Sequence, residues 1–150
     1  MSPMDMRERV RVGVWSGAVA AAAVVGALVG IGWRAGVPSR PFNAIAVLLL
    51  RGRAEGVWGF DAVVTPAGAV VTLGTVFLLG IIFSLIAAPW RGLRLLIAGV
   101  AVSAAAYGAT RAALAPLLQP TLAAALTPAQ LALACVVLAV ALVAGIRLAR

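Results

Sequence analysis

The sequence predicts an all-α polytopic integral membrane protein with four transmembrane helices and a short interfacial or re-entrant segment. Hydrophobic residues make up 64% of the chain and charged residues only 11%, whereas average apolar usage is about 45–50%. The mean hydropathy is +1.13. Four apolar runs, at residues 12–33, 63–88, 93–115 and 128–146, approach or exceed the length that a helix needs to cross a bilayer core of about 30 Å. We therefore assign residues 1–150 to a single transmembrane domain.

The net charge of +8 comes from twelve arginines against four acidic residues. The arginines lie mostly between or beside the apolar runs, where basic residues set membrane topology and meet anionic headgroups. No basic stripe lies on a soluble element, so we expect a lipid bilayer as the charged partner and no nucleic acid.

The residue types that build metal centres and active sites are scarce. The chain has no histidine, and its one cysteine, Cys135, lies inside an apolar run. Nucleophile-elbow, phosphate-loop and zinc-protease motifs are missing, as are paired carboxylates within the spans. We predict no catalytic residue, no metal, no cofactor and no enzymatic activity.

The run at residues 12–33 follows three arginines, as in a signal peptide, but it exceeds the 7–15 residues typical of a signal sequence. We therefore predict an uncleaved first helix. Gly13 and Gly17 form one GxxxG pair, and Gly26 and Gly30 form a second pair on nearly the opposite face. Such pairs let helices approach closely in lipid. If both pack, the helix has a neighbour on each side; the alternative is an accident of a composition rich in Gly and Ala.

The segment after the first helix is the longest between spans. Pro38 and Pro41 end the helix. The apolar stretch Phe42–Leu50 is too short to span, so it lies at the interface or re-enters partway. Arg51 and Arg53 then meet lipid phosphates.

The later helices carry clear boundary signals. Pro66 suits the first turn of the second span, and Pro89 ends it before a basic turn, which predicts a tight antiparallel hairpin into the third span. Thr127, Pro128 and Gln130 predict a capping box at the start of the fourth.

The third span carries a polar face. Gly99, Ser103, Tyr107 and Arg111 recur every four residues and share one side of the helix. An intramembrane arginine is a functional-site hypothesis with a partner to be named, and Asp61 is the acid predicted on the same membrane side. Structural pairing with Asp61, snorkelling of Arg111 to headgroups, and an anion or lipid-headgroup site are the three interpretations.

The positive-inside rule gives an orientation. One side receives Arg7, Arg9, Arg11, Arg91, Arg94, Arg147 and Arg150, and the other receives Arg34, Arg40, Arg51, Arg53 and Arg111. Seven against five places both termini in the cytoplasm.

The stretch from Gly32 to Pro41, followed by Phe42-Asn43, resembles the end of the first helix in YagU-like bacterial inner-membrane proteins. The order of spans is also similar, including Phe83-Ser84 and the hairpin that follows. The resemblance implies a four-helix protein of the bacterial inner membrane. That family has histidines around its second and third spans, and this chain has none.

The function predicted from these features is a structural or accessory subunit, packing its small-residue faces against another copy or within a larger membrane complex. The alternative is a small transporter or channel for an anion or lipid-like solute, using the polar face around Arg111.

Overall fold

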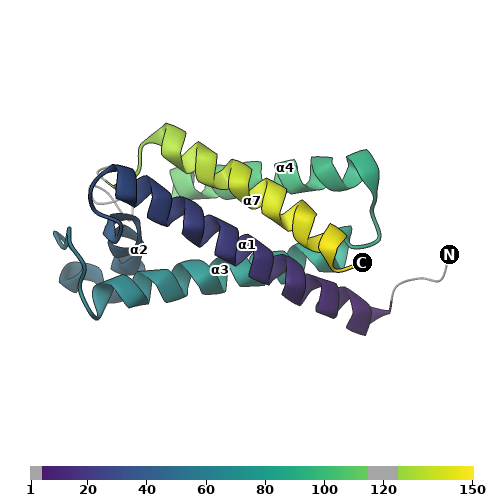
Figure 1. Cartoon of the computed structure of the whole chain (residues 1–150), viewed down its shortest axis with the longest axis horizontal. Coiled ribbons are helices and arrows are strands. Elements are labelled where there is room, and N and C mark those ends of the chain that lie inside the picture. The colour runs from purple at the N-terminus through teal and green to yellow at the C-terminus, as the bar shows by residue number, and fades with distance from the viewer. Residues whose placement is uncertain (1–4, 115–124) are drawn as a thin grey trace.

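The computed structural model describes residues 5–114 and 125–150, and its regular elements there are all helical, with no strand. The elements are α1 (Met6–Arg34), α2 (Arg40–Leu50), a 3-10 turn η1 (Arg51–Arg53), α3 (Val64–Ala87), α4 (Gly92–Ala109), a π-helical continuation η2 (Thr110–Leu114) and α7 (Pro128–Leu148) (Figure 1). In the described part of the chain, four helices are long and apolar enough to cross a membrane: Met6–Arg34, Val64–Ala87, Gly92–Ala112 and Pro128–Leu148. The prediction of an all-α polytopic membrane protein is confirmed.

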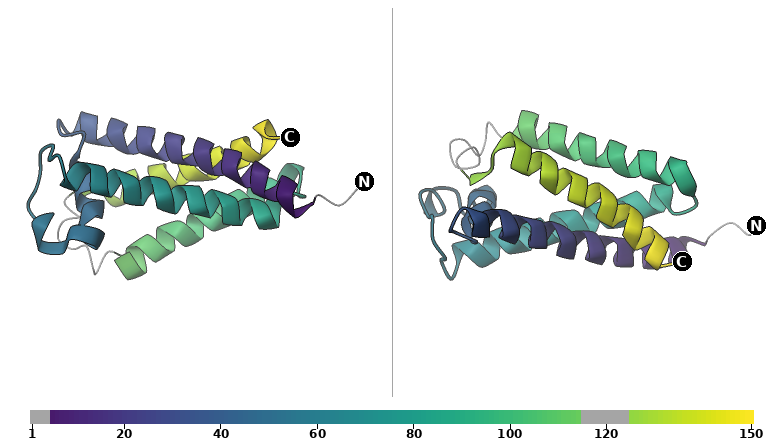
Figure 2. Two further views of the ribbon diagram at one scale, coloured as in Figure 1. Left: turned by 90° about the horizontal axis from the view of Figure 1, so that it is seen from below. Right: turned by 45° about the horizontal axis from the view of Figure 1, so that its top comes forward.

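The long helices are arranged around α1. This helix packs against both α3 and α7, while α4 packs mainly on the far side of α7 and α2 packs on α3. Both termini and the turn between α3 and α4 lie at one end of the molecule, and α2 with its following loop lies at the other (Figures 1 and 2). Successive long helices therefore run in opposite directions, as successive membrane crossings must.

Backbone carbonyls in the α3–α4 turn region hold the termini to this end. The Arg150 guanidinium donates hydrogen bonds to the carbonyl oxygens of Ala88 and Trp90, the second at 2.7 Å. Arg9 Nη1 donates to the Leu85 carbonyl oxygen at 3.1 Å. Hydrogen bonds from charged donors are stronger than neutral ones, so these contacts fix the ends of α1 and α7 beside the turn.

Local signals set the helix ends. The Asp5 side chain caps α1 by accepting from the Met6 amide at 2.6 Å, so the helix begins six residues before the apolar run at 12–33. The capping box of α7 is confirmed: Thr127 Oγ1 accepts from the Gln130 amide at 3.3 Å, and Gln130 Oε1 accepts from the Thr127 amide at 2.9 Å.

The contact between α1 and α3 is made by glycines. A Cβ atom built on Gly17 would lie 2.6 Å from the Phe77 carbonyl oxygen, and one built on Gly80 would lie 2.6 Å from the Gly17 amide nitrogen. Gly13 lies against Ile81 and Ser84 in the same contact. Backbone meets backbone here, which only glycine permits.

The turn between α3 and α4 has only four residues, as predicted for a hairpin, but the two helices diverge beyond it (Figure 2). A Cβ atom on Gly99 of α4 would lie 3.3 Å from the Ala139 carbonyl oxygen and 2.7 Å from a Val143 methyl. Since apolar burial gives no preference between helices in lipid, this close approach to α7 decides where α4 packs.

Candidate functional site: the groove between α4 and α7

The polar face predicted on the third span turns toward α7. Gly99 and Ser103 are buried against that helix, Tyr107 is half-buried, and Arg111 is exposed on η2. The four-residue spacing therefore places three of the four residues along one helix contact. Burial decreases steadily along the face, from Gly99 to Arg111.

A groove of about 370 Å³ opens along this contact beyond Gly99. Its α4 side is formed by Val100, Ser103, Ala104 and Tyr107, and its α7 side by Ala132, Cys135, Val136, Ala139 and Val140. The three valines are well exposed, so the groove lies on the outer surface of the bundle, which faces lipid. We call it the α4–α7 groove.

Ser103 stands apart from the other buried hydroxyl residues of the described spans. Its side chain is 4% exposed, and its Oγ has no hydrogen-bond partner among residues 5–114 and 125–150. By contrast, Thr72 Oγ1 donates to the Gly68 carbonyl and Thr110 Oγ1 to the Ala106 carbonyl, each at 2.8 Å. Returning a hydrogen bond to the preceding turn is the usual solution for such residues, and Ser103 does not adopt it.

A second groove, of about 250 Å³, separates α3 from α4 near their turn. Phe83, Trp90 and Val102 are among its lining residues, and only apolar atoms reach its surface. It gives a ligand no polar anchor. The α4–α7 groove is the one that combines an apolar wall with an unsatisfied hydroxyl.

The described residues show no ion pair between Asp61 and Arg111. The Asp61 carboxylate accepts hydrogen bonds from the Val63 and Val64 amides, each at 2.8 Å, and so caps α3. Those two bonds lower the pKa of the Asp61 carboxyl, the bond from Val64 having the larger effect, and the positive charge of Arg53 lowers it further. The free amides at the start of α3 satisfy the acid locally.

The two glycine pairs of α1 have different surroundings. Gly13 and Gly17 lie against α3. At Gly26 and Gly30, no other side chain or helix lies within 4 Å of the position where a Cβ atom would be. The second pair therefore faces outward from the bundle.

Sequence reasoning missed a polar cluster at the end of the bundle opposite the termini. Asn43 is 1% exposed; its amide nitrogen donates to the Val57 and Gly59 carbonyls at 3.0 and 2.7 Å, and its amide oxygen accepts from Thr65 Oγ1 at 2.7 Å. These bonds tie α2 to the loop before α3 and to α3 itself. The signal was an isolated asparagine within the apolar stretch 42–50.

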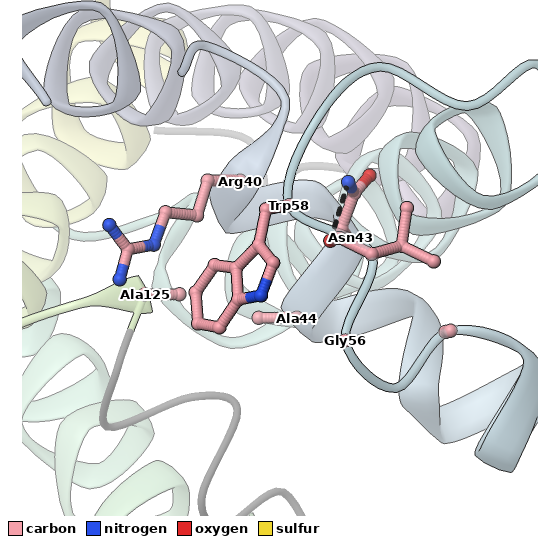
Figure 3. Close-up of a pocket in the computed structure, with 8 residues that line it drawn as sticks. Arg40, Asn43, Ala44, Gly56, Trp58 and Ala125 are labelled. Carbon is pink, nitrogen blue, oxygen red and sulfur yellow. Dashed lines mark hydrogen bonds between the residues drawn. The ribbon is translucent and has the colours of Figure 1, made fainter. Parts of the chain in front are cut away.

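Figure 3 shows the outer side of this cluster, where the Arg40 guanidinium lies over the Trp58 ring, 4.5 Å from the ring centroid. This is a cation–π geometry. The crevice beside it has a volume of only about 10 Å³, which is at most enough for one water molecule. The cluster therefore holds the loop against α2 and α3, and it leaves no room for a ligand.

No family model, curated protein or solved structure matches the chain.

Proposed function

We propose that this chain is a structural or accessory subunit that packs laterally with other membrane-spanning chains, including further copies of itself. The observation that carries the proposal is the outward face of α1. Small residues recur there every four positions and are exposed: Ala18, Ala22, Gly26 and Gly30. We call this face the α1 ridge.

The α1 ridge has the properties of a helix-packing surface. Ridges of small residues let helix backbones approach closely in lipid, where apolar burial gives no driving force. The opposite face of the same helix already uses Gly13 and Gly17 in this way against α3. Trp15 and Trp33, 60% and 73% exposed, lie toward the two ends of the helix, where aromatic residues anchor a helix at both interfaces.

Assembly is better supported than transport. The Thr72 and Thr110 hydroxyls are occupied by carbonyls of their own helices, and the wall of the α4–α7 groove is largely apolar. A path for an anion needs polar groups that face one another across a passage. We assign Arg111, exposed near the end of α4, to contact with anionic headgroups.

The arginine distribution supports a location for the subunit. Seven arginines flank the end that carries both termini and the α3–α4 turn. By the positive-inside rule this end is cytoplasmic. We propose a multi-pass protein of the bacterial inner membrane in this orientation.

Gly30→Leu is expected to shift the purified protein from an oligomer to a monomer without unfolding it. The leucine would crowd a neighbouring helix at the α1 ridge, whereas within the chain no side chain or other helix lies within 4 Å of that position. Light scattering after gel filtration in mild detergent measures the mass, and circular dichroism measures helix content. Gly74→Leu on α3, also exposed with no such neighbour within 4 Å, is the matched control. An unchanged mass in Gly30→Leu would contradict the proposal.

A further inference from the structure

We infer that the α4–α7 groove of one copy receives the α1 ridge of a second copy, and that Ser103 donates a hydrogen bond to a main-chain carbonyl of that helix. The inference rests on the proposed function and names the partner and the contact. The Ser103 hydroxyl has no hydrogen-bond partner among the described residues.

Two other buried serines within the spans serve as donors between helices. Ser16 Oγ donates to the Leu142 carbonyl at 3.0 Å, joining α1 to α7, and Ser84 Oγ donates to the Arg9 carbonyl at 2.9 Å, joining α3 to α1. Both serines are fully buried. Ser103 is buried in the same manner and lacks the corresponding carbonyl among the described residues.

The depth of Ser103 in the bilayer limits which groups can accept a hydrogen bond from its hydroxyl. Ser103 lies near the middle of the span Gly92–Ala112, so it sits at the centre of the bilayer, where lipid tails carry no acceptor. Ester and headgroup oxygens lie at the interface. The acceptor at this depth is therefore a group of another protein helix, as is common between transmembrane helices.

The α1 ridge lies at the matching depth. Gly145 of α7 packs on Ser16 of α1. Because the two helices run in opposite directions, Cys135, ten residues before Gly145, lies at the same depth as Gly26, ten residues after Ser16. Gly99 packs on residues 139–143 of α7, so Ser103 is level with residues 135–139 and hence with residues 22–26 of α1. All copies insert in one orientation, so contacting residues must share a depth, and the centre of the ridge meets Ser103.

The two surfaces also fit chemically. Several groove residues are small, including Ala104 and Ala132, which leaves room for a helix backbone. Gly26 has no side chain to shield its neighbouring carbonyls. Because ridge and groove are different surfaces, the contact is head-to-tail and generates a ring or an open row of copies.

Cysteine cross-linking tests the contact in native membranes. Cys135 is the only cysteine of the chain and lines the groove, so Gly26→Cys supplies the second thiol on the ridge. Oxidation with copper phenanthroline is expected to give dimers and higher multimers, because each copy carries both thiols and a disulfide forms only when the Cα atoms approach within about 7 Å. Adding Cys135→Ser to Gly26→Cys should abolish the ladder.

Val70→Cys is the matched control for depth. Gly80 packs on Gly17, so Val70, ten residues before Gly80, is level with Gly26, nine residues after Gly17. Its side chain is 64% exposed on α3, and we expect no ladder from it. Ala104→Leu, which fills the groove at an exposed position, is expected to remove the Gly26→Cys ladder and to leave the helix content unchanged.

The outcomes separate the inference from the proposed function. A ladder from Gly26→Cys alone, lost with Ala104→Leu, supports the contact. An oligomeric parent protein without this ladder, or an equal ladder from Val70→Cys, overturns the contact and leaves lateral assembly standing. A ladder that persists with Ala104→Leu places the ridge outside the groove and overturns it too. A parent protein that is monomeric and recovered without partner chains overturns both.

Discussion

Gly80→Leu is expected to separate α1 from α3 and to destabilise the protein by about 3 kcal/mol or more, since overpacking alone typically costs 1–3 kcal/mol. A side chain added at position 80 would meet the backbone of Gly17 and not a flexible side chain. The strain can therefore be relieved only by moving a helix, and α1 is the helix around which the others are arranged. Unfolding by increasing SDS in mixed micelles, followed by circular dichroism, measures the loss.

Gly74→Leu is the control for this substitution on the same helix. It makes the same chemical change six residues earlier, at an exposed site with no other side chain or helix within 4 Å. Surface changes of this kind usually stay within about 0.5 kcal/mol. Equal unfolding midpoints for the two variants would contradict the close contact of α1 and α3.

Asn43→Ala is expected to release the loop between α2 and α3. The change removes a buried side chain that is the partner of two carbonyl oxygens and of the Thr65 hydroxyl. A net contribution of about 1 kcal/mol for each of the three hydrogen bonds gives an expected total loss of about 3 kcal/mol. Faster tryptic cleavage after Arg51 and Arg53, both exposed in the loop, reports the release directly.

Thr65→Val separates this network effect from a general loss of stability. It keeps the side-chain shape but removes the bond to Asn43 and the acceptor of the Asp61 amide. We expect a smaller loss, of about 1 kcal/mol per hydrogen bond, and intermediate cleavage. Tryptic cleavage of Asn43→Ala at the parent rate would show that the cluster does not hold the loop.

The sequence predicts the features of this fold that depend on neighbouring residues. The capping box at Thr127 and Gln130 depends on residues three apart, and the spans depend on runs of apolar residues. One of the three interpretations of Arg111, its pairing with Asp61, rested on opposite charge and a shared membrane side. It overlooked that free amides at a helix start, here those of Val63 and Val64, satisfy a preceding acid at shorter range.

The spacing of the glycines on α1 predicts two faces but not which of them lies inside. Gly17 and Gly26 belong to pairs of the same type, and lipid gives neither face a preference. The close approach of Gly80 to Gly17 decides this, and it joins residues 63 positions apart. Likewise, the spacing predicts the face that holds Ser103, whereas its missing acceptor emerges only from the packing of α4 on α7.

In the four-span architecture α1 crosses the membrane once, and we place both termini on the cytoplasmic side. Glu8, in the first turn of α1, and Glu55, in the loop between α2 and α3, are exposed acidic residues at opposite ends of the bundle, and acidic residues contribute little to topology. Each is changed to cysteine in a Cys135→Ser background and labelled with a membrane-impermeant maleimide. We predict that Glu55→Cys is labelled in intact bacterial cells and that Glu8→Cys is labelled only after permeabilisation. Labelling of both from the same side would contradict the crossing, and with it the four-span architecture.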